Sequence, residues 1–177
     1  MNKLLRRLNL MKTIFTVLFC FFLLPLFSQT AESYFKEAEQ KYSSQNYKEA
    51  ILLYSKAIKL DPEKVNYYLR RGFCHDVLKD YDSAIEDYSQ VIRIDPKQKW
   101  AYNSRGSAKN KINAFKDALK DFDAAIALDS KDCEAYNNRG FAKKMLGDKD
   151  GACADWNKSK KMGNEEAKII LKNNHCK

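Results

Sequence analysis

Proline, glycine and histidine are scarce in this sequence: its 177 residues include 3 Pro, 6 Gly and 2 His. No segment rich in serine, glycine or proline divides the chain, which argues against a flexible linker between domains. The strict alternation of apolar and polar residues that marks β-strands is also absent. Apolar residues recur instead at helical spacings, as in Ala50, Ile51, Tyr54, Ala57 and Ile58. We therefore expect a single all-α domain.

Motifs of catalysis and of metal binding are missing as well. The sequence has no nucleophile elbow, no glycine-rich phosphate loop and no metalloprotease signature. Only two histidines, His75 and His175, could act as bases at neutral pH. Each is next to a cysteine, but neighbours on a helix point apart, and neither CxxC nor HxxxH spacing occurs. The sequence therefore predicts a protein that is not an enzyme and that binds no metal or other cofactor.

A dense basic stripe is also absent, although the formal net charge is +9. Four cations lie in the first residues, Lys3, Arg6, Arg7 and Lys12, and without them the net charge falls to +5. Later segments such as 116–125 intersperse acidic and basic residues, as solvated helix faces do. Nucleic acid is therefore not an expected partner.

The longest uncharged apolar run covers residues 14–27 and is shorter than the roughly 20 residues of a typical membrane span. It follows the four cations and ends at small and polar residues, which is the order found in secretory signal peptides. We expect residues 1–28 to be a signal peptide cleaved near Ser28 or Gln29. The exported protein would then keep no stable membrane span.

The N-terminal segment also allows other interpretations. If it is not cleaved, it would anchor the protein in a membrane. Translation could start at Met11, because the segment from there on already has the features of a signal. Lipidation of Cys20 is disfavoured, because Phe19 precedes it where such processing needs a small residue.

Glycines recur every 34 residues, at Gly72, Gly106 and Gly140, each with an arginine directly before it. Alanines and aromatics repeat with the same period: Ala50, Ala84, Ala118 and Ala152, and Tyr54, Tyr88, Phe122 and Trp156. A fixed period of this length is the signature of stacked helical repeats. We expect helices to cross closely at the glycines and alanines, with the aromatic side chains filling the wider gaps beside them.

Together with the helix-ending pairs Asp61-Pro62 and Asp95-Pro96, this pattern resembles the tetratricopeptide repeat over about residues 31–165. The resemblance implies an all-α, right-handed solenoid of antiparallel helix pairs. The expected repeats are about 31–64, 65–98, 99–132 and 133–163, within a solenoid of residues 31–163, and a capping helix follows in 164–177. The expected helices are about 31–44, 47–60, 65–78, 81–94, 99–112, 115–128, 133–146, 149–161 and 164–175.

The end units depart from the repeat pattern. The first unit has Ala38 in place of the glycine, and the fourth ends in Met162-Gly163 without a proline. Such departures are typical of capping repeats, which have solvent on one side. In the last helix Ala167, Ile170 and Leu171 form an apolar face that would cover the end of the fourth unit.

An arginine and an aspartate also repeat together. The arginines are Arg71, Arg105 and Arg139, and the aspartates are Asp87, Asp121 and Asp155. The first unit lacks both and has Glu37 and Leu53 at these places. Their joint absence indicates that each arginine pairs with the aspartate of its own unit. The alternative is that the arginines bind a carboxylate of a partner in a groove.

In the tetratricopeptide repeat family, the first helix of each unit lines a concave groove. By this resemblance the groove residues are Phe35, Tyr42, Leu69, Arg70, Phe73, Trp100, Asn103, Ser104, Ser107, Asn137, Asn138, Phe141 and Met145. Aromatics, amides and a few cations suit an extended peptide or a helix. The alternative is that some of the aromatics only pack between units.

One class of the family clamps a C-terminal carboxylate of a chaperone with lysines and asparagines. The matching positions here carry Phe35, Glu39, Arg70, Trp100 and Ser104. We therefore expect no such clamp.

Four cysteines follow the expected signal, Cys74, Cys133, Cys153 and Cys176, and export would allow them to oxidise. Cys74 takes the place of alanines in later units and is expected to be a small buried residue. A bridge from Cys74 to Cys133 would have to cross a whole repeat. We expect a disulfide between Cys153 and Cys176 that holds the last helix over the core, and two free thiols.

The sequence as a whole predicts an exported, non-enzymatic module that binds a protein or peptide. Its two ends look like those of exported bacterial proteins of the Bacteroidetes type, which implies the periplasm or the periplasmic side of the outer membrane. One alternative is an assembly subunit of an envelope complex, or a homo-oligomer, that binds through its ends or convex side. An enzyme or small-ligand protein would need a deep closed pocket, which the sequence does not predict.

Overall fold

The described part of the chain is entirely helical. The computed structural model describes residues 30–176, and the segment from Ala31 onward forms a compact unit of its own. Its helices are α2 (Ala31–Ser43), α3 (Tyr47–Leu60), α4 (Val65–Val77), α5 (Tyr81–Ile94), α6 (Lys99–Lys111), α7 (Phe115–Leu128), α8 (Cys133–Met145), α9 (Lys149–Lys161) and α10 (Glu165–Asn173). The expected helix bounds agree with these to within two residues. The expected signal peptide lies outside the described residues.

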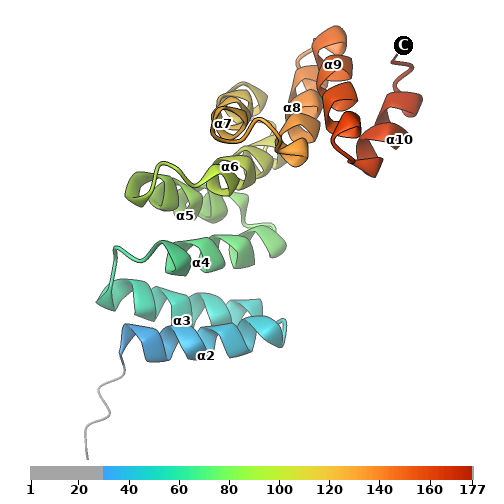
Figure 1. Ribbon diagram of the computed structural model, residues 1–177. Coiled ribbons are helices and arrows are strands. Elements are labelled where there is room, and N and C mark those ends of the chain that lie inside the picture. The colour runs from blue at the N-terminus through green and yellow to red at the C-terminus, as the bar shows by residue number, and fades with distance from the viewer. Residues whose placement is uncertain (1–29, 177) are drawn as a thin grey trace, which may run out of the picture. The chain divides into compact units, whose positions relative to one another are not determined.

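Consecutive helices pack side by side along the chain (Figure 1). The contacts are most extensive within the pairs α2 with α3, α4 with α5, α6 with α7 and α8 with α9, which are here called units one to four. We call α2, α4, α6 and α8 the first helices, and the other member of each pair the second helix. The predicted solenoid of helix pairs is confirmed.

Side chains that accept backbone hydrogen bonds begin several helices. Asp132, Asp148 and Asn164 each accept from the backbone amide three residues later, at 3.0, 2.9 and 3.1 Å. Such caps satisfy amides that have no partner inside the helix. The predicted helix ends at the Asp-Pro pairs are confirmed, because α3 stops before Asp61 and α5 before Asp95.

The turn inside each unit requires a left-handed backbone at one fixed register. Gln45, Lys79, Asn113 and Gly147 have φ angles of 59°, 63°, 62° and 88°. These residues are again 34 apart, so the repeat extends to the backbone conformation of the turn. Only the fourth unit uses glycine, the residue that adopts this conformation most easily.

The repeated glycines lie where a first helix presses on the aromatic of its own second helix. A Cβ atom on Gly106 would lie 2.8 Å from the ring of Phe122, and one on Gly140 would lie 2.7 Å from the indole of Trp156. Both aromatic side chains are buried. The close crossings predicted at the glycines are therefore confirmed.

Replacing Gly106 by alanine tests this close approach. In a helix with free space, the change would stabilise by about 1 kcal/mol through helix propensity. Here we expect a loss of about 1–3 kcal/mol in the free energy of unfolding, because the added methyl group overlaps a fixed ring. Urea unfolding followed by circular dichroism measures the difference. In a Phe122→Leu background the same change should cost less, and an equal cost in both backgrounds would contradict this account.

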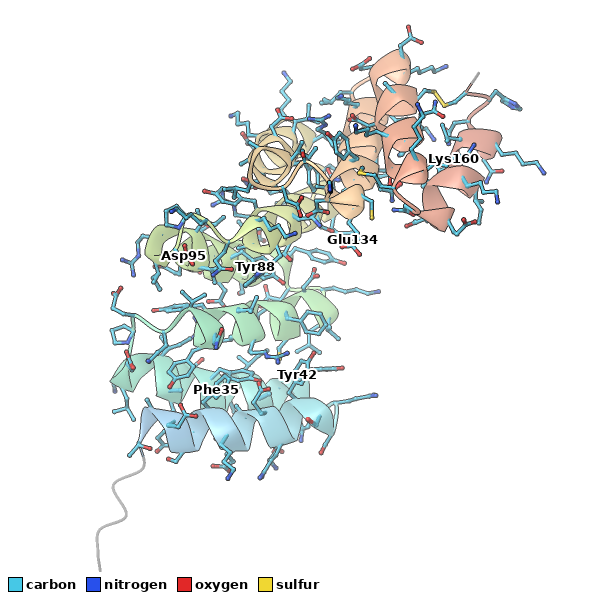
Figure 2. All side chains as sticks on the ribbon, viewed as in Figure 1. Phe35, Tyr42, Tyr88, Asp95, Glu134 and Lys160 are labelled. Carbon is cyan, nitrogen blue, oxygen red and sulfur yellow. A yellow bond between two sulfur atoms is a disulfide. The ribbon has the colours of Figure 1, made fainter. Side chains whose placement is uncertain are left out.

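The last helix covers the end of the fourth unit. Ala167 and Leu171 of α10 are buried against Ala152 and Trp156 of α9, and Ile170 packs at the edge of this cluster. Cys153 and Cys176 form a disulfide with their Cα atoms 5.6 Å apart, visible as a yellow bond in Figure 2. The apolar face and the disulfide thus both hold the end of the chain against α9.

Candidate functional site

Each repeated arginine forms a two-pronged hydrogen bond with the aspartate of its own unit. Arg71 Nε and Nη2 donate to Asp87 at 2.9 and 2.6 Å. Arg105 and Arg139 bond their aspartates in the same way. The structure thus has the within-unit pairing that the joint absence of both residues in the first unit indicated. We call these three pairs the arginine ladder.

The same arginines also bond the second helix of the preceding unit. Arg71 Nη1 donates to Ser55 Oγ at 2.8 Å, and Arg105 Nη1 donates to Ser89 Oγ at 3.0 Å. Arg139 Nη1 instead pairs with the Asp123 carboxylate at 2.6 Å. Each arginine therefore joins three helices, and a fixed guanidinium fork suits this task.

Lysines reinforce two of the three pairs. Lys109 Nζ lies 2.8 Å from Asp121, and Lys143 Nζ lies 2.8 Å from Asp155. The second unit has His75 at this register, and its ring bonds Asp80 at 3.0 Å instead. Neither the lysines nor the partners in the preceding unit were predicted, although both repeat every 34 residues in the sequence.

Burial affects the pKa of the ladder carboxyl in unit two. Burial raises the pKa of the Asp87 carboxyl, while hydrogen bonds and charge from Arg71 act in the opposite direction. The hydrogen bond to Asp155 raises the pKa of Arg139. Because their donors are directed at these carboxylates and at the preceding unit, the ladder arginines are structural rather than available to a partner.

The predicted groove residues differ widely in exposure. Phe73, Phe141 and Met145 are 41%, 44% and 49% exposed. Asn137 is buried, and the other members are half-buried: Phe35, Tyr42, Leu69, Arg70, Trp100, Asn103, Ser104, Ser107 and Asn138. The exposed apolar side chains of the predicted groove therefore lie in units two and four, on either side of unit three.

Several of the half-buried aromatics pack between units. The ring of Phe35 lies 5.0 Å from that of Tyr67 and 5.8 Å from that of Tyr54, measured between centroids. Leu69 and Trp100 pack against the buried cluster of Tyr68, Val91 and Ala101. For these three predicted groove residues, packing between units accounts for much of the side chain.

In units one and two a charged pair lies among aromatic rings. Arg70 Nε lies 3.4 Å from Glu39, and its guanidinium lies 5.2 Å from the centre of the Tyr42 ring. The Tyr42 ring in turn contacts Phe73 edge-on, at 5.7 Å between centroids. The Tyr54 hydroxyl donates to the same Glu39 carboxylate. Arg70 is therefore held in place beside the exposed Phe73. Figure 2 labels Phe35 and Tyr42 in this part of the solenoid.

In units three and four, asparagines replace this charged and aromatic cluster. Asn138 Nδ2 donates to Asn103 Oδ1 at 3.2 Å, and Asn110 Nδ2 donates to the Asn138 carbonyl at 3.2 Å. Asn137 Nδ2 donates to the Glu166 carboxylate at 3.2 Å, so α10 contacts the predicted groove. The Asn137 carbonyl accepts from Trp156 Nε1 at 3.1 Å. The contact with α10 was not predicted.

The two free cysteines of the described residues differ in surroundings. Cys74 is buried in a cluster with Ala38, Ala50 and Tyr54, and burial raises the pKa of its thiol to about 12. Cys133 is half-buried at the start of α8. A neutral, enclosed thiol fits the role of a small apolar residue that was expected for Cys74.

Residues 30–176 contain neither a cluster of metal-binding side chains nor a helix that could cross a membrane. No group of three or more His, Cys, Asp or Glu side chains there could hold a metal ion. No helix of this part is both long and apolar enough to span a membrane. What this part offers is a surface of first-helix side chains.

Comparisons with known proteins agree with this architecture. Residues 65–98 match a family model described as a tetratricopeptide repeat, and residues 38–75 match one described as a TPR repeat. No curated protein matches the sequence. Solved structures do match this chain.

The chain is similar to a crystal structure of MamA protein, with 26% identity and a TM-score of 0.75 over 78% of this chain and 77% of that one. The Arabidopsis OM64 TPR domain matches at 26% identity and a TM-score of 0.61, over 64% of this chain and 94% of that one. The first TPR of Spaghetti (RPAP3), bound to the HSP90 peptide SRMEEVD, has the same fold at 24% identity and a TM-score of 0.64, over 68% and 95%. The described part of the chain is thus a solenoid of the tetratricopeptide-repeat fold, and residues 38–98 carry the matching repeats.

Proposed function

We propose that the protein is a non-enzymatic scaffold that binds a peptide segment of a partner along its first helices. The observation that carries this proposal is the exposure of Phe73, Phe141 and Met145 on those helices. Phe73 and Phe141 occupy the same register two units apart, with Ser107 between them. A surface with apolar ends and a polar centre suits an extended segment with apolar anchors at both ends.

The fold supports this role. Its first helices are held by the arginine ladder and by close packing, so the surface is formed before a partner arrives. A preformed surface lowers the entropy lost on binding. The RPAP3 structure, in which this fold is bound to a peptide, is consistent with such use at the level of the fold.

Peptides selected from a random display library against the full chain test the proposal. We expect the Phe73→Ala, Phe141→Ala double variant to bind the selected peptides about tenfold more weakly, because both anchors lose their ring contacts. The matched control is Leu52→Ala, Leu60→Ala, which removes two exposed leucines from the second helix α3. Unchanged affinity in the first variant, or an equal loss in the control, would contradict the proposal.

A second candidate function is assembly with other copies or with an envelope complex through the second helices. The exposure of leucines on α3 and α7 favours this assembly function. The exposed fractions are 63%, 55% and 44% for Leu52, Leu60 and Leu128. Light scattering after size exclusion separates the two candidates. A stable oligomer that the Leu52→Ala, Leu60→Ala control converts to a monomer would support assembly.

We further propose that the protein works in the bacterial cell envelope, in the periplasm or at the outer membrane. The support is the order of cations and apolar residues in 1–28 together with the disulfide between Cys153 and Cys176. Cell fractionation and the mass of the exported chain test this. A chain that stays in the cytoplasm with its N-terminus intact would contradict it.

A further inference from the structure

A cavity of about 410 Å³ lies where α10 meets the first helices of units three and four. Asn110, Asn137, Phe141, Glu166 and Ile170 are among the residues that line it. A second cavity of about 360 Å³ shares Asn137 and Glu166 with the first. The two cavities are therefore adjacent, and together they make up a region at the C-terminal end of the proposed peptide surface.

Two amide oxygens in this region have no hydrogen-bond partner among the described residues. They are Asn110 Oδ1 and Asn137 Oδ1, and the two side chains are 9% and 7% exposed. Their orientation follows from their other bonds, because each Nδ2 group faces an acceptor, the Asn138 carbonyl or the Glu166 carboxylate. A buried acceptor without a partner is unfavourable, so a donor that reached these atoms would be stabilised.

The charged groups of this region favour a cation. Glu166 is exposed and lines both cavities, and Glu134, labelled at the start of α8 in Figure 2, lines the second. Lys111 is the only cation that lines either of these two cavities in the described structure. Acceptors and carboxylates thus predominate here, although the chain as a whole has a net charge of +9.

Phe141 adds an aromatic wall. Its ring is 44% exposed and contacts Phe115 edge-on, at 6.2 Å between centroids, which leaves part of the ring open to a ligand. A guanidinium group over an aromatic face is attracted by the negative electrostatic potential of that face. Ring, amide oxygens and carboxylate together match a flat cation with several donors.

We infer that this region binds an arginine side chain of the partner peptide. The inference rests on the proposed peptide-binding function and adds a charge preference at one end of the peptide. In this arrangement the cation pairs with Glu166, donates toward Asn110 and Asn137, and lies against Phe141. An acidic group would meet Glu134 and Glu166 with only Lys111 to offset them.

Two small probes test the inference: N-acetyl-arginine amide and the neutral isostere N-acetyl-citrulline amide. Titration into the ¹⁵N-labelled full chain is followed by the side-chain amide signals of Asn110 and Asn137. We expect the arginine probe to bind about fivefold more tightly, the upper end for a partly exposed charge pair. Added salt should reduce this difference, because it screens the pair.

The variant Glu166→Gln isolates the charge. Its side chain can still accept from Asn137 Nδ2, so the fold is preserved, and the preference for arginine over citrulline should fall to about one. The matched control is Glu165→Gln on the same helix, because Glu165 is exposed and bonds Lys168 of its own helix at 3.5 Å. This control should keep the preference.

Equal binding of the two probes by the unaltered chain would overturn the inference, as would an unchanged preference in Glu166→Gln. The outcome is separable from the test of the proposed function. If selected peptides depend on Phe73 and Phe141 but the arginine preference is absent, only the cation site is refuted. If the arginine preference is present but no peptide depends on those rings, only the peptide-binding function is refuted.

Discussion

Replacing Arg71 by methionine should destabilise the protein by about 3–5 kcal/mol, the cost of leaving a buried charge without its partner. Asp87 is 2% exposed, and Arg71 supplies both of its charged hydrogen bonds. The change also removes the bond to Ser55 of the first unit. Urea unfolding followed by circular dichroism measures the loss.

The third unit provides a matched comparison. Arg105→Met should cost less than Arg71→Met, because Lys109 remains 2.8 Å from Asp121. Combining Arg71→Met with Asp87→Leu should recover much of the loss, since replacing both partners by apolar groups is often close to neutral. Equal losses for the two arginine variants would contradict the role given to the lysine.

The Arg71→Met defect should also depend on pH. Burial already raises the pKa of the Asp87 carboxyl, and removing the arginine removes the effect that opposes it. The folded variant therefore binds a proton more readily than the unfolded chain, so its stability rises as pH falls through the raised pKa of Asp87. The difference from the unaltered protein should shrink on acidification, and a constant difference would show that Asp87 does not titrate.

Removing the disulfide with Cys153→Ser, Cys176→Ser should cost about 3 kcal/mol, from the chain entropy of a loop of this length. The two cysteines are 23 residues apart. The loss should be local at first, because α10 has 9 residues and a free helix of this length is marginal. Hydrogen exchange at the amides of Ala167 and Leu171 measures the release.

A reducing agent serves as the control for the disulfide. It should destabilise the unaltered protein by a similar amount and leave the double serine variant unchanged. Since Glu166 lies on α10, both treatments should also weaken the preference for the arginine probe. Unchanged exchange in α10 after reduction would show that apolar packing alone holds this helix.

The 34-residue period predicted the close crossings, the helical spacing of apolar residues predicted the helices, and the resemblance to the tetratricopeptide repeat implied their pairing. Gly72, Gly106 and Gly140 recur with aromatics sixteen residues later, and each such pair meets in the structure. The pairing of arginine with aspartate could be predicted from the first unit, because that unit lacks both residues. Residues that recur with the repeat indicate contacts that also recur. The close crossings and the arginine pairs could therefore be predicted from the sequence.

Contacts that do not repeat were not predictable in this way. The Asn110 register carries Asp76 in the second unit and Lys144 in the fourth, so no period marks its bond to Asn138. The bond between Asn137 and Glu166 depends on how α10 lies over the fourth unit, and α10 belongs to no repeat. The cation site is built from such contacts, which is why the resemblance pointed to a groove but not to its charge preference.

Ser55, Ser89 and Asp123, which accept hydrogen bonds from the ladder arginines, all occupy one register of the repeat. Their positions are 34 residues apart, but serine and aspartate are also common on solvated helix faces, so their recurrence alone did not indicate a contact. The same holds for Lys109 and Lys143. A search of the sequence for polar residues at every repeated register would have found both sets.

The arginine ladder is graded along the chain. Its first arginine bonds a neutral serine of the preceding unit. Its last arginine bonds the Asp123 carboxylate, shares its own aspartate with Lys143, and lies in unit four, which the disulfide joins to the end of the chain. In a linear array of repeats, unfolding begins where the coupling between neighbours is weakest. The solenoid should therefore unfold first at α2 while its C-terminal half persists. Tension on the first unit would then detach a peptide from Phe73 before the peptide's cation left Glu166.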